Sequence, residues 1–222
     1  MSSTPHPVIA IDGTAASGKS TFARALARRL NYVYVNTGAM YRGVTWALQT
    51  KQVPLAEAEA VTGALSTLAV ETFLREGRCW FLIDGIDPES HAREGQVNEG
   101  VSLVAQVPAV RRLLVAQQQS LAVAAPLVME GRDIGTVVFP QTAYKFFIDA
   151  DARVRAERRS RQGESDVVLA RDALDSGRKH SPLTCAPDAL ALDSGHASVD
   201  ELVETALRHL AAKGLMASVG EL

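Results

Sequence analysis

The sequence of 222 residues has only two cysteines, Cys79 and Cys185, and no C-x-x-C pair. This shortage argues against a disulfide framework and against a zinc site of the usual ligand spacing. Long apolar runs are missing too, because the run from Val8 to Ile11 is far too short for a signal peptide or a membrane span. We therefore expect a cytoplasmic protein with reduced cysteines and no membrane partner.

Lysine is scarce as well, with five residues against eighteen arginines, although basic and acidic residues nearly balance to a net charge of −2. The balance argues against a protein that coats nucleic acid or binds a membrane surface. Arginine forms planar, bidentate contacts to phosphate, and eight of the eighteen lie between Arg132 and Arg178. A genomic base composition that favours arginine and alanine codons explains the excess equally well.

Composition and periodicity predict an α/β protein. Apolar residues at 47% and charged residues at 22% are typical of globular chains, and this length suffices for one large domain without disulfides or metals. Strand-like runs alternate with helical patterns, which indicates a parallel sheet flanked by helices. Hydrophobic periodicity places strands at 8–11, 32–35, 127–129, 144–148 and 189–192, and helices at 19–30, 39–48, 55–68, 97–124 with a break at Pro108, 151–162 and 199–213.

A hairpin interrupts this alternation. The runs 70–74 and 79–83 are strand-like, and a short turn separates them. We therefore predict a small β-containing insertion from about Leu68 to Gln96. The last helix carries a capping box, with Ser198 as N-cap and Glu201 three residues later.

The segment from Gly13 to Ser20 fits the phosphate-binding pattern G-x-x-x-x-G-K-[ST], directly after a predicted strand and before a predicted helix. Its backbone N–H groups and the helix start favour phosphate oxygens. Lys19 would reach the β- and γ-phosphates, and the Ser20 hydroxyl would ligate Mg²⁺. A chance match is disfavoured by the strand–loop–helix context. The predicted nucleoside triphosphate site comprises Gly13, Thr14, Ala15, Ala16, Ser17, Gly18, Lys19, Ser20 and Thr21.

The P-loop alone does not identify the phosphate acceptor. A guanine-specifying N-K-x-D motif is absent, because no lysine follows an asparagine. The apolar run that ends at Glu130 carries one acid, whereas energy-transducing ATPases usually carry a pair. These absences leave the small-molecule kinases, which are marked by a second, arginine-lined phosphate site.

Two loops offer that second site. Residues 36–42 follow the second predicted strand and residues 131–136 follow the third, so both belong at the carboxyl edge of the sheet beside the P-loop. Arg132 suits a phosphate. Asp133 next to it can only accept hydrogen bonds, for example from the exocyclic amine of a base.

Together these residues resemble the bacterial cytidylate kinases of the P-loop nucleoside monophosphate kinase superfamily, over nearly the whole chain. The resemblance rests on four motifs in order: the P-loop that begins Ile11-Asp12-Gly13, residues 37–42 (TGAMYR), residues 130–140 (EGRDIGTVVFP), and residues 171–178 (RDALDSGR) followed by Ser181-Pro182-Leu183. The last two are highly specific in combination.

The resemblance implies an ATP- and Mg²⁺-dependent enzyme that phosphorylates CMP and dCMP, and a monomer with no nucleic-acid partner. It implies a P-loop kinase fold in one domain that spans residues 1–222, with an NMP-binding insertion and a short lid. The implied parts are a core at about 1–38, 125–152 and 180–222, an NMP-binding region at about 39–124, and a lid at about 153–179.

Carried over by position, the resemblance also implies roles for acceptor residues. Ser102, Arg111 and Asp133 would read the cytosine edge, while Thr37 and Asp175 would contact the sugar. Arg111 could instead belong to a solvated helix face, and Asp175 could merely cap a turn. The spacing of both within their motifs favours the functional interpretation.

The remaining implied roles concern phosphate. Arg42 and Arg132 would bind the α-phosphate of CMP, and Arg171 and Arg178 would approach the phosphates from the other side. Arg158 on the predicted lid helix would reach the ATP phosphates, although most arginines of such a helix are solvated. The expected catalytic set is Lys19, Arg132, Arg171 and Arg178.

The sequence departs from the family pattern in a few places. Asn36 stands where Asp is usual, and Thr14 and Ala16 replace the usual Pro and Gly of the P-loop. The stretch from Arg159 to Arg171 is shorter than in many members, which indicates a truncated lid. Two rival functions remain open: a P-loop kinase for UMP, AMP or a non-nucleotide acceptor, and a non-catalytic ATP-binding domain.

Overall fold

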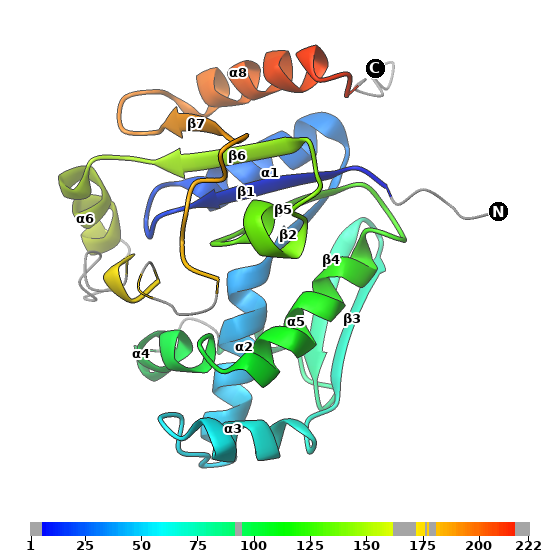
Figure 1. The fold of residues 1–222 in the computed structure, drawn as a ribbon, viewed down its shortest axis with the longest axis vertical. Coiled ribbons are helices and arrows are strands. Elements are labelled where there is room, and N and C mark those ends of the chain that lie inside the picture. The colour runs from blue at the N-terminus through cyan, green and yellow to red at the C-terminus, as the bar shows by residue number, and fades with distance from the viewer. Residues whose placement is uncertain (1–5, 92–94, 162–171, 176, 178–180, 216–222) are drawn as a thin grey trace.

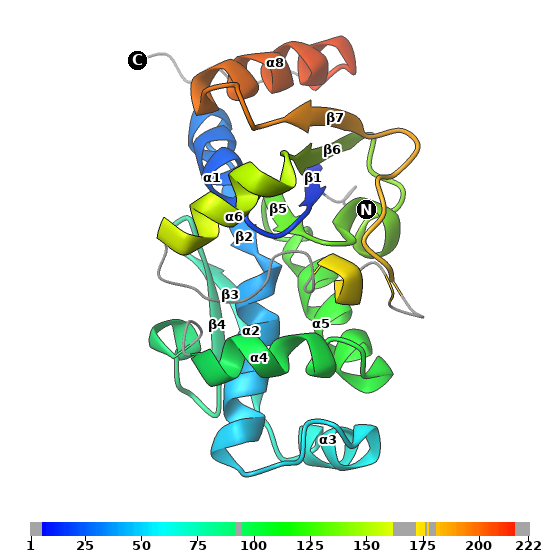
Figure 2. The same ribbon diagram turned by 90° about the vertical axis from the view of Figure 1, so that its left-hand side faces the viewer.

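The computed structural model describes residues 6–91, 95–161, 172–175, 177 and 181–215. A parallel sheet with its covering helices forms one part of the molecule, and a helical part with a β-hairpin forms the other (Figure 1). The view turned by 90° shows α2 (Thr37–Thr50) running from the sheet into the helical part (Figure 2). The predicted α/β class with an insertion is therefore confirmed.

The sheet has five strands in the order β2-β5-β1-β6-β7, and all of the pairings are parallel. β1 is the central strand, and every one of its residues is buried. The carboxyl ends of the five strands lie at one edge of the sheet, which is where ligands of open α/β sheets bind. The strands are β1 (Val8–Gly13), β2 (Val33–Asn36), β5 (Leu127–Gly131), β6 (Tyr144–Asp149) and β7 (Leu190–Asp193).

Helices cover both faces of this sheet. On one face, α1 (Lys19–Leu30) and α8 (Val199–Ala212) pack on a core that includes Phe22 and Phe146. On the other face, α5 (Pro108–Leu121) and the short π-helix η2 (Ile134–Val138) cover a second core cluster. The capping box expected at Ser198 is present at the start of α8.

The helical part has its own apolar core, which lies between helices and hairpin. It is built from α2, α3 (Ala58–Leu65), α4 (Gly95–Val104), α5 and the antiparallel pair β3 (Val70–Arg75) and β4 (Arg78–Ile83). A short 3-10 helix, η1 (Pro88–Ser90), follows the hairpin, and α6 (Ala152–Arg161) leaves the sheet after β6.

The predicted elements are confirmed, apart from a few differences. The third predicted helix is shorter than 55–68, and η1 and η2 are helical elements that the sequence pattern did not predict. Pro108 is the first residue of α5, where its missing N–H leaves no helical bond unmade. Within the described ranges, none of the helices combines the length and the apolar character that crossing a bilayer needs.

Candidate active site

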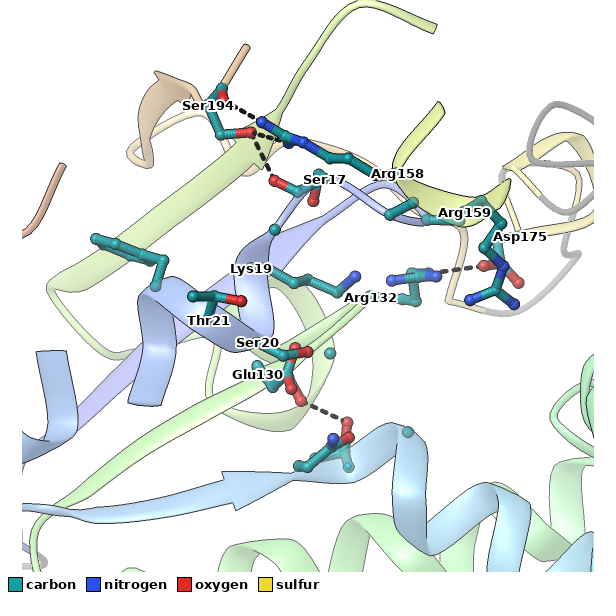
Figure 3. A pocket seen from close by; sticks show the side chains of 18 of the residues that line it. Ser17, Lys19, Ser20, Thr21, Glu130, Arg132, Arg158, Arg159, Asp175 and Ser194 are labelled. Carbon is teal, nitrogen blue, oxygen red and sulfur yellow. Dashed lines mark hydrogen bonds and ion pairs between the residues drawn. The ribbon is translucent and has the colours of Figure 1, made fainter. Parts of the chain in front are cut away.

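A cleft of about 890 Å³ opens at the carboxyl edge of the sheet. The P-loop from Ala15 to Thr21 lines it, whereas Gly13 and Thr14 do not. Arg158 and Arg159 also line it (Figure 3), and so does Arg161. The expected acceptor residues that line the same cleft are Thr37, Arg42, Ser102, Arg111, Arg132, Asp133 and Asp175.

The P-loop takes its shape from two unusual backbone positions. Gly13 lies so close to β6 that a Cβ atom would be 2.1 Å from the carbonyl oxygen of Ile148, so only glycine fits. Ala16 has a φ of 57°, in the left-handed region that disfavours residues with a Cβ. The loop thus makes its turn without the second glycine. Lys19 Nζ donates to the carbonyl oxygen of Thr14 at 2.9 Å.

Arg132 connects the loop after β5 with two other segments. Its Nε donates to Asp175 Oδ2 at 2.7 Å, and one terminal nitrogen donates to the carbonyl oxygen of Gly13 at 2.9 Å. Asp175 is buried at 2% exposure. The structure therefore brings together a phosphate-binding candidate and a sugar-binding candidate that are 43 residues apart.

Arg111 and Asp133 form an ion pair that is almost fully buried, through Arg111 Nη2 and Asp133 Oδ2. The Arg111 guanidinium also lies 5.9 Å from the ring centre of Tyr41. Ser102 on α4 is buried and lines the same cleft. The interpretation of Arg111 as part of a solvated helix face is wrong, because it is 6% exposed.

The loop after β2 places two more expected residues. Thr37 donates to the carbonyl oxygen of Glu130 at 2.7 Å. Gly38 makes room for Arg42, whose terminal nitrogen would lie 3.3 Å from an added Cβ. Asn36 stands where the family pattern of the sequence analysis has aspartate. Its side chain accepts a hydrogen bond from the N–H of Ala39 and caps α2.

Arg158 reaches the P-loop through a serine. Its guanidinium donates to the carbonyl oxygen of Ser194 at 2.6 Å and to its hydroxyl at 3.1 Å. That hydroxyl donates to the carbonyl oxygen of Ser17 at 2.6 Å, and the links are visible in Figure 3. Arg158 therefore lies over the start of α1, where phosphate is expected.

Arg155 differs from its neighbours on α6 because it is buried. It forms an ion pair with Asp172 and donates to the carbonyl oxygen of Ala15 at 3.2 Å. Asp172 in turn accepts the N–H of Ala15 at 2.9 Å. The backbone N–H and C=O of the P-loop residue Ala15 are thus both held by this ion pair, whose arginine is buried and whose aspartate is half-buried. Arg171 and Arg178, which the sequence analysis named as catalytic, lie outside the described residues.

Glu130 is a cleft residue to which the sequence analysis gave no role. It is the last residue but one of β5, is 2% exposed, and accepts a hydrogen bond from the Tyr34 hydroxyl at 2.5 Å. Burial and this carboxylate raise the pKa of Tyr34, which keeps the phenol protonated as the donor. The single acid after the apolar run was the sequence signal for this residue.

An oxygen-binding metal would fit the floor of the cleft. Mg²⁺ prefers oxygen ligands, and the Ser20 hydroxyl and the Glu130 carboxylate line the same cleft (Figure 3). Among the described residues, no group of three or more His, Cys, Asp or Glu side chains forms a metal cluster. A metal here would therefore also need oxygens from the bound nucleotide.

Comparisons with known proteins point to one family. The family model described as cytidylate kinase matches residues 9–212. A cytidylate kinase of Desulforamulus reducens is 40% identical over 213 residues, which cover 91% of this chain and 96% of that protein. A cytidylate kinase of Lactiplantibacillus plantarum is 42% identical over 207 residues, which cover 88% of this chain and 90% of that protein.

Proposed function

The chain belongs to the cytidylate kinase family, and from this premise we propose that it transfers the γ-phosphoryl group of ATP to CMP and dCMP. The observation that carries the proposal is that the P-loop and the cluster of Ser102, Arg111 and Asp133 line one cleft. A P-loop holds triphosphate, and a carboxylate beside an arginine suits a base edge with an amine and acceptors. Direct transfer requires donor and acceptor in one site.

Transfer is an in-line displacement at the γ-phosphorus. An oxygen of the CMP phosphate attacks it, the bond to the β–γ bridging oxygen breaks, and ADP leaves with that electron pair. The attacking oxygen is already an anion, so we propose that no residue acts as an obligate general base. The contribution of the protein is alignment and charge neutralisation.

Named side chains supply that neutralisation in the proposal. Lys19 binds the β- and γ-phosphates of ATP, and Arg158 lies over the same end of the P-loop. Arg42 and Arg132 bind the CMP phosphate opposite it. Thr37 and Asp175 contact the sugar, and Arg171 and Arg178 complete the set of cations around the transferred group.

Ser20 and Glu130 would hold Mg²⁺, and they fit it as an oxygen donor pair. An ion held there would supply positive charge against the charge that develops on the phosphates during transfer. Tyr34 keeps the Glu130 carboxylate in place through its hydrogen bond. Asn36 does not supply a second carboxylate, because it is an amide that caps α2.

We also propose that the enzyme is a cytoplasmic monomer without nucleic-acid or membrane partners. The nearly balanced charge of the sequence, with a net charge of −2, supports the absence of nucleic-acid and membrane partners, whereas the monomer is carried over from the resemblance to the family. Sedimentation equilibrium at several protein concentrations tests the monomer, since a concentration-dependent mass would contradict it.

The first experiment measures ADP formation from ATP–Mg²⁺ with CMP, dCMP, UMP, AMP and GMP. We expect high turnover with CMP and dCMP and low turnover with the others. Comparable rates with UMP would show that the base-reading cluster is wrongly assigned. Turnover with none of them would contradict the proposal and leave a different acceptor.

Two variants sharpen this experiment. Asp133→Ala should lower kcat/KM for CMP by about 100-fold and reduce its preference over UMP, because an unpaired buried partner remains. Asp84→Ala is the control, since Asp84 is an exposed carboxylate that is paired with Lys51 and does not line the cleft. Lys19→Ala should abolish transfer to every acceptor. An unchanged base preference in Asp133→Ala would contradict the assignment of the base reader.

A further inference from the structure

Asp12 is a buried carboxylate that has no role in the mechanism above. It is 4% exposed in β1, and it does not line the cleft. Its Oδ1 accepts the N–H of Ile134 at 2.7 Å, and its Oδ2 accepts the N–H of Gly135 at 2.8 Å. These two amides directly follow Arg132 and Asp133. The carboxylate therefore holds the backbone of the loop that carries two proposed acceptor residues.

A second contact runs in the opposite direction between the same segments. The Arg132 side chain donates to the carbonyl oxygen of Gly13 at 2.9 Å, and Asp12 pairs with Gly131 in the sheet register. Each segment thus holds the backbone of the other with a side chain. Gly13 is the first residue of the P-loop. These crossed contacts therefore fix the P-loop, on the phosphoryl-donor side of the cleft, relative to the loop on the phosphoryl-acceptor side.

The loop has little freedom to move away from Asp12. A Cβ on Gly135 would lie 3.1 Å from a side-chain carbon of Lys145 and 3.4 Å from Asp12 Oδ2. Lys145 is itself buried and pairs with Asp188 at 2.9 Å. The start of η2 is therefore packed between a carboxylate on one side and an anchored lysine stem on the other.

Resting on the proposed function, we propose that Asp12 is a positioning residue that aligns the acceptor loop with the P-loop for in-line transfer. Each substrate binds mainly to its own side of the cleft, so we expect loss of alignment to lower the rate of transfer far more than either affinity. The rate of transfer depends on the placement of one side relative to the other, and a displacement of about 1 Å costs on the order of 100-fold in rate.

Asp12→Asn is the first test. Its side-chain oxygen can accept one amide hydrogen bond, but its NH₂ group then faces the other N–H. We expect kcat with ATP and CMP to fall roughly 10- to 100-fold, while KM and the equilibrium Kd for CMP and for a non-hydrolysable ATP analogue change less than about threefold. A merely structural role would instead lower the folded fraction and leave kcat per folded molecule unchanged.

Asp12→Glu is the second variant, for the case that Asp12→Asn does not fold. It keeps the charge and both acceptor oxygens but adds one methylene, which displaces the loop from the P-loop. We expect the same fall in kcat with unchanged affinities. Asp188→Asn is the matched control, because it loosens Lys145 on the other side of the same loop without altering the crossed contacts.

The outcomes separate this inference from the proposed function. Failure of the wild-type enzyme to phosphorylate CMP would refute the proposed function itself. Wild-type turnover together with unchanged kcat in the folded Asp12 variants would refute only the role of Asp12. A loss confined to CMP affinity, or an equal fall in kcat in Asp188→Asn, would also overturn it.

Discussion

Asp12 should make the stability of the enzyme depend on pH in a way that one substitution removes. Burial raises the pKa of Asp12 from its ordinary 3.8 to about 6, with Asp133 adding to this effect and the two backbone N–H groups and Lys19 opposing it. The folded protein therefore holds this proton more tightly than the unfolded chain does. The resulting stability is present in full below pH 3.8 and is lost as pH rises through 6.

The magnitude follows from the two pKa values. A rise from 3.8 to about 6 corresponds to about 3 kcal/mol in the free energy of unfolding, of which roughly half is lost between about pH 5 and pH 7.5. The amide of Asp12→Asn carries no charge at any of these pH values. The variant should therefore gain stability relative to the wild type by about that amount over this interval.

Urea unfolding of both proteins at several pH values measures this difference. The comparison cancels titrating groups that do not interact with Asp12. The thiol of Cys185 does interact with it, but burial and the Asp12 charge raise its pKa above the ordinary 9.0, so it stays protonated from pH 5 to pH 7.5. The hydrogen bond lost in the variant shifts all points equally, so the slope with pH is diagnostic. A difference that is constant from pH 5 to pH 7.5, or that moves in favour of the wild type, would refute the buried ionised carboxylate.

Three further outcomes can be checked on purified protein. Ala16→Gly should stabilise the protein by about 1 kcal/mol in thermal unfolding, because the φ of 57° strains a residue with a Cβ; a lower melting temperature would contradict this. Raising salt from about 50 to about 500 mM should increase KM for both substrates several-fold with little change in kcat, because a cation-lined cleft attracts polyanions; salt-independent KM values would argue against this attraction. A double-mutant cycle of Arg155→Ala and Asp172→Ala should show a coupling of about 1–3 kcal/mol in urea unfolding, whereas additive losses would show that their pair contributes no energy of its own.

The fold was largely predictable because most elements carry local signals. α1 begins and ends where periodicity placed it, between Gly18 and Asn31, both of which adopt left-handed backbone conformations. The π-helix η2 could not be predicted in this way. The N–H of its first residue donates to Asp12, more than 120 residues earlier in the chain. A prediction from the periodicity of neighbouring residues cannot detect such a long-range contact.

The candidate site was predictable as a set of loops but not as a set of contacts. Motif spacing identified Lys19, Arg132 and Asp133, and the parallel sheet brings their loops together at one edge. The role of Arg155 was not predictable, because its helix looks uniformly charged in sequence and only the fold buries one of its arginines. Glu130 was visible only as a lone acid, since its partner Tyr34 comes from a different strand.

The ion pair between Arg111 and Asp133 competes with a base for the same two side chains of the proposed base reader. In the described structure Arg111 Nη2 already contacts Asp133 Oδ2, so we expect an incoming base to compete with this ion pair. Cytosine can offer an amine to the carboxylate and acceptors to the guanidinium, whereas uracil presents a carbonyl oxygen where the amine should be. The contacts of a bound base would thus have to outweigh those of the protein's own ion pair, and not only those that the free residues would make with water. In the proposed base reader, a mismatched base would leave that pair closed.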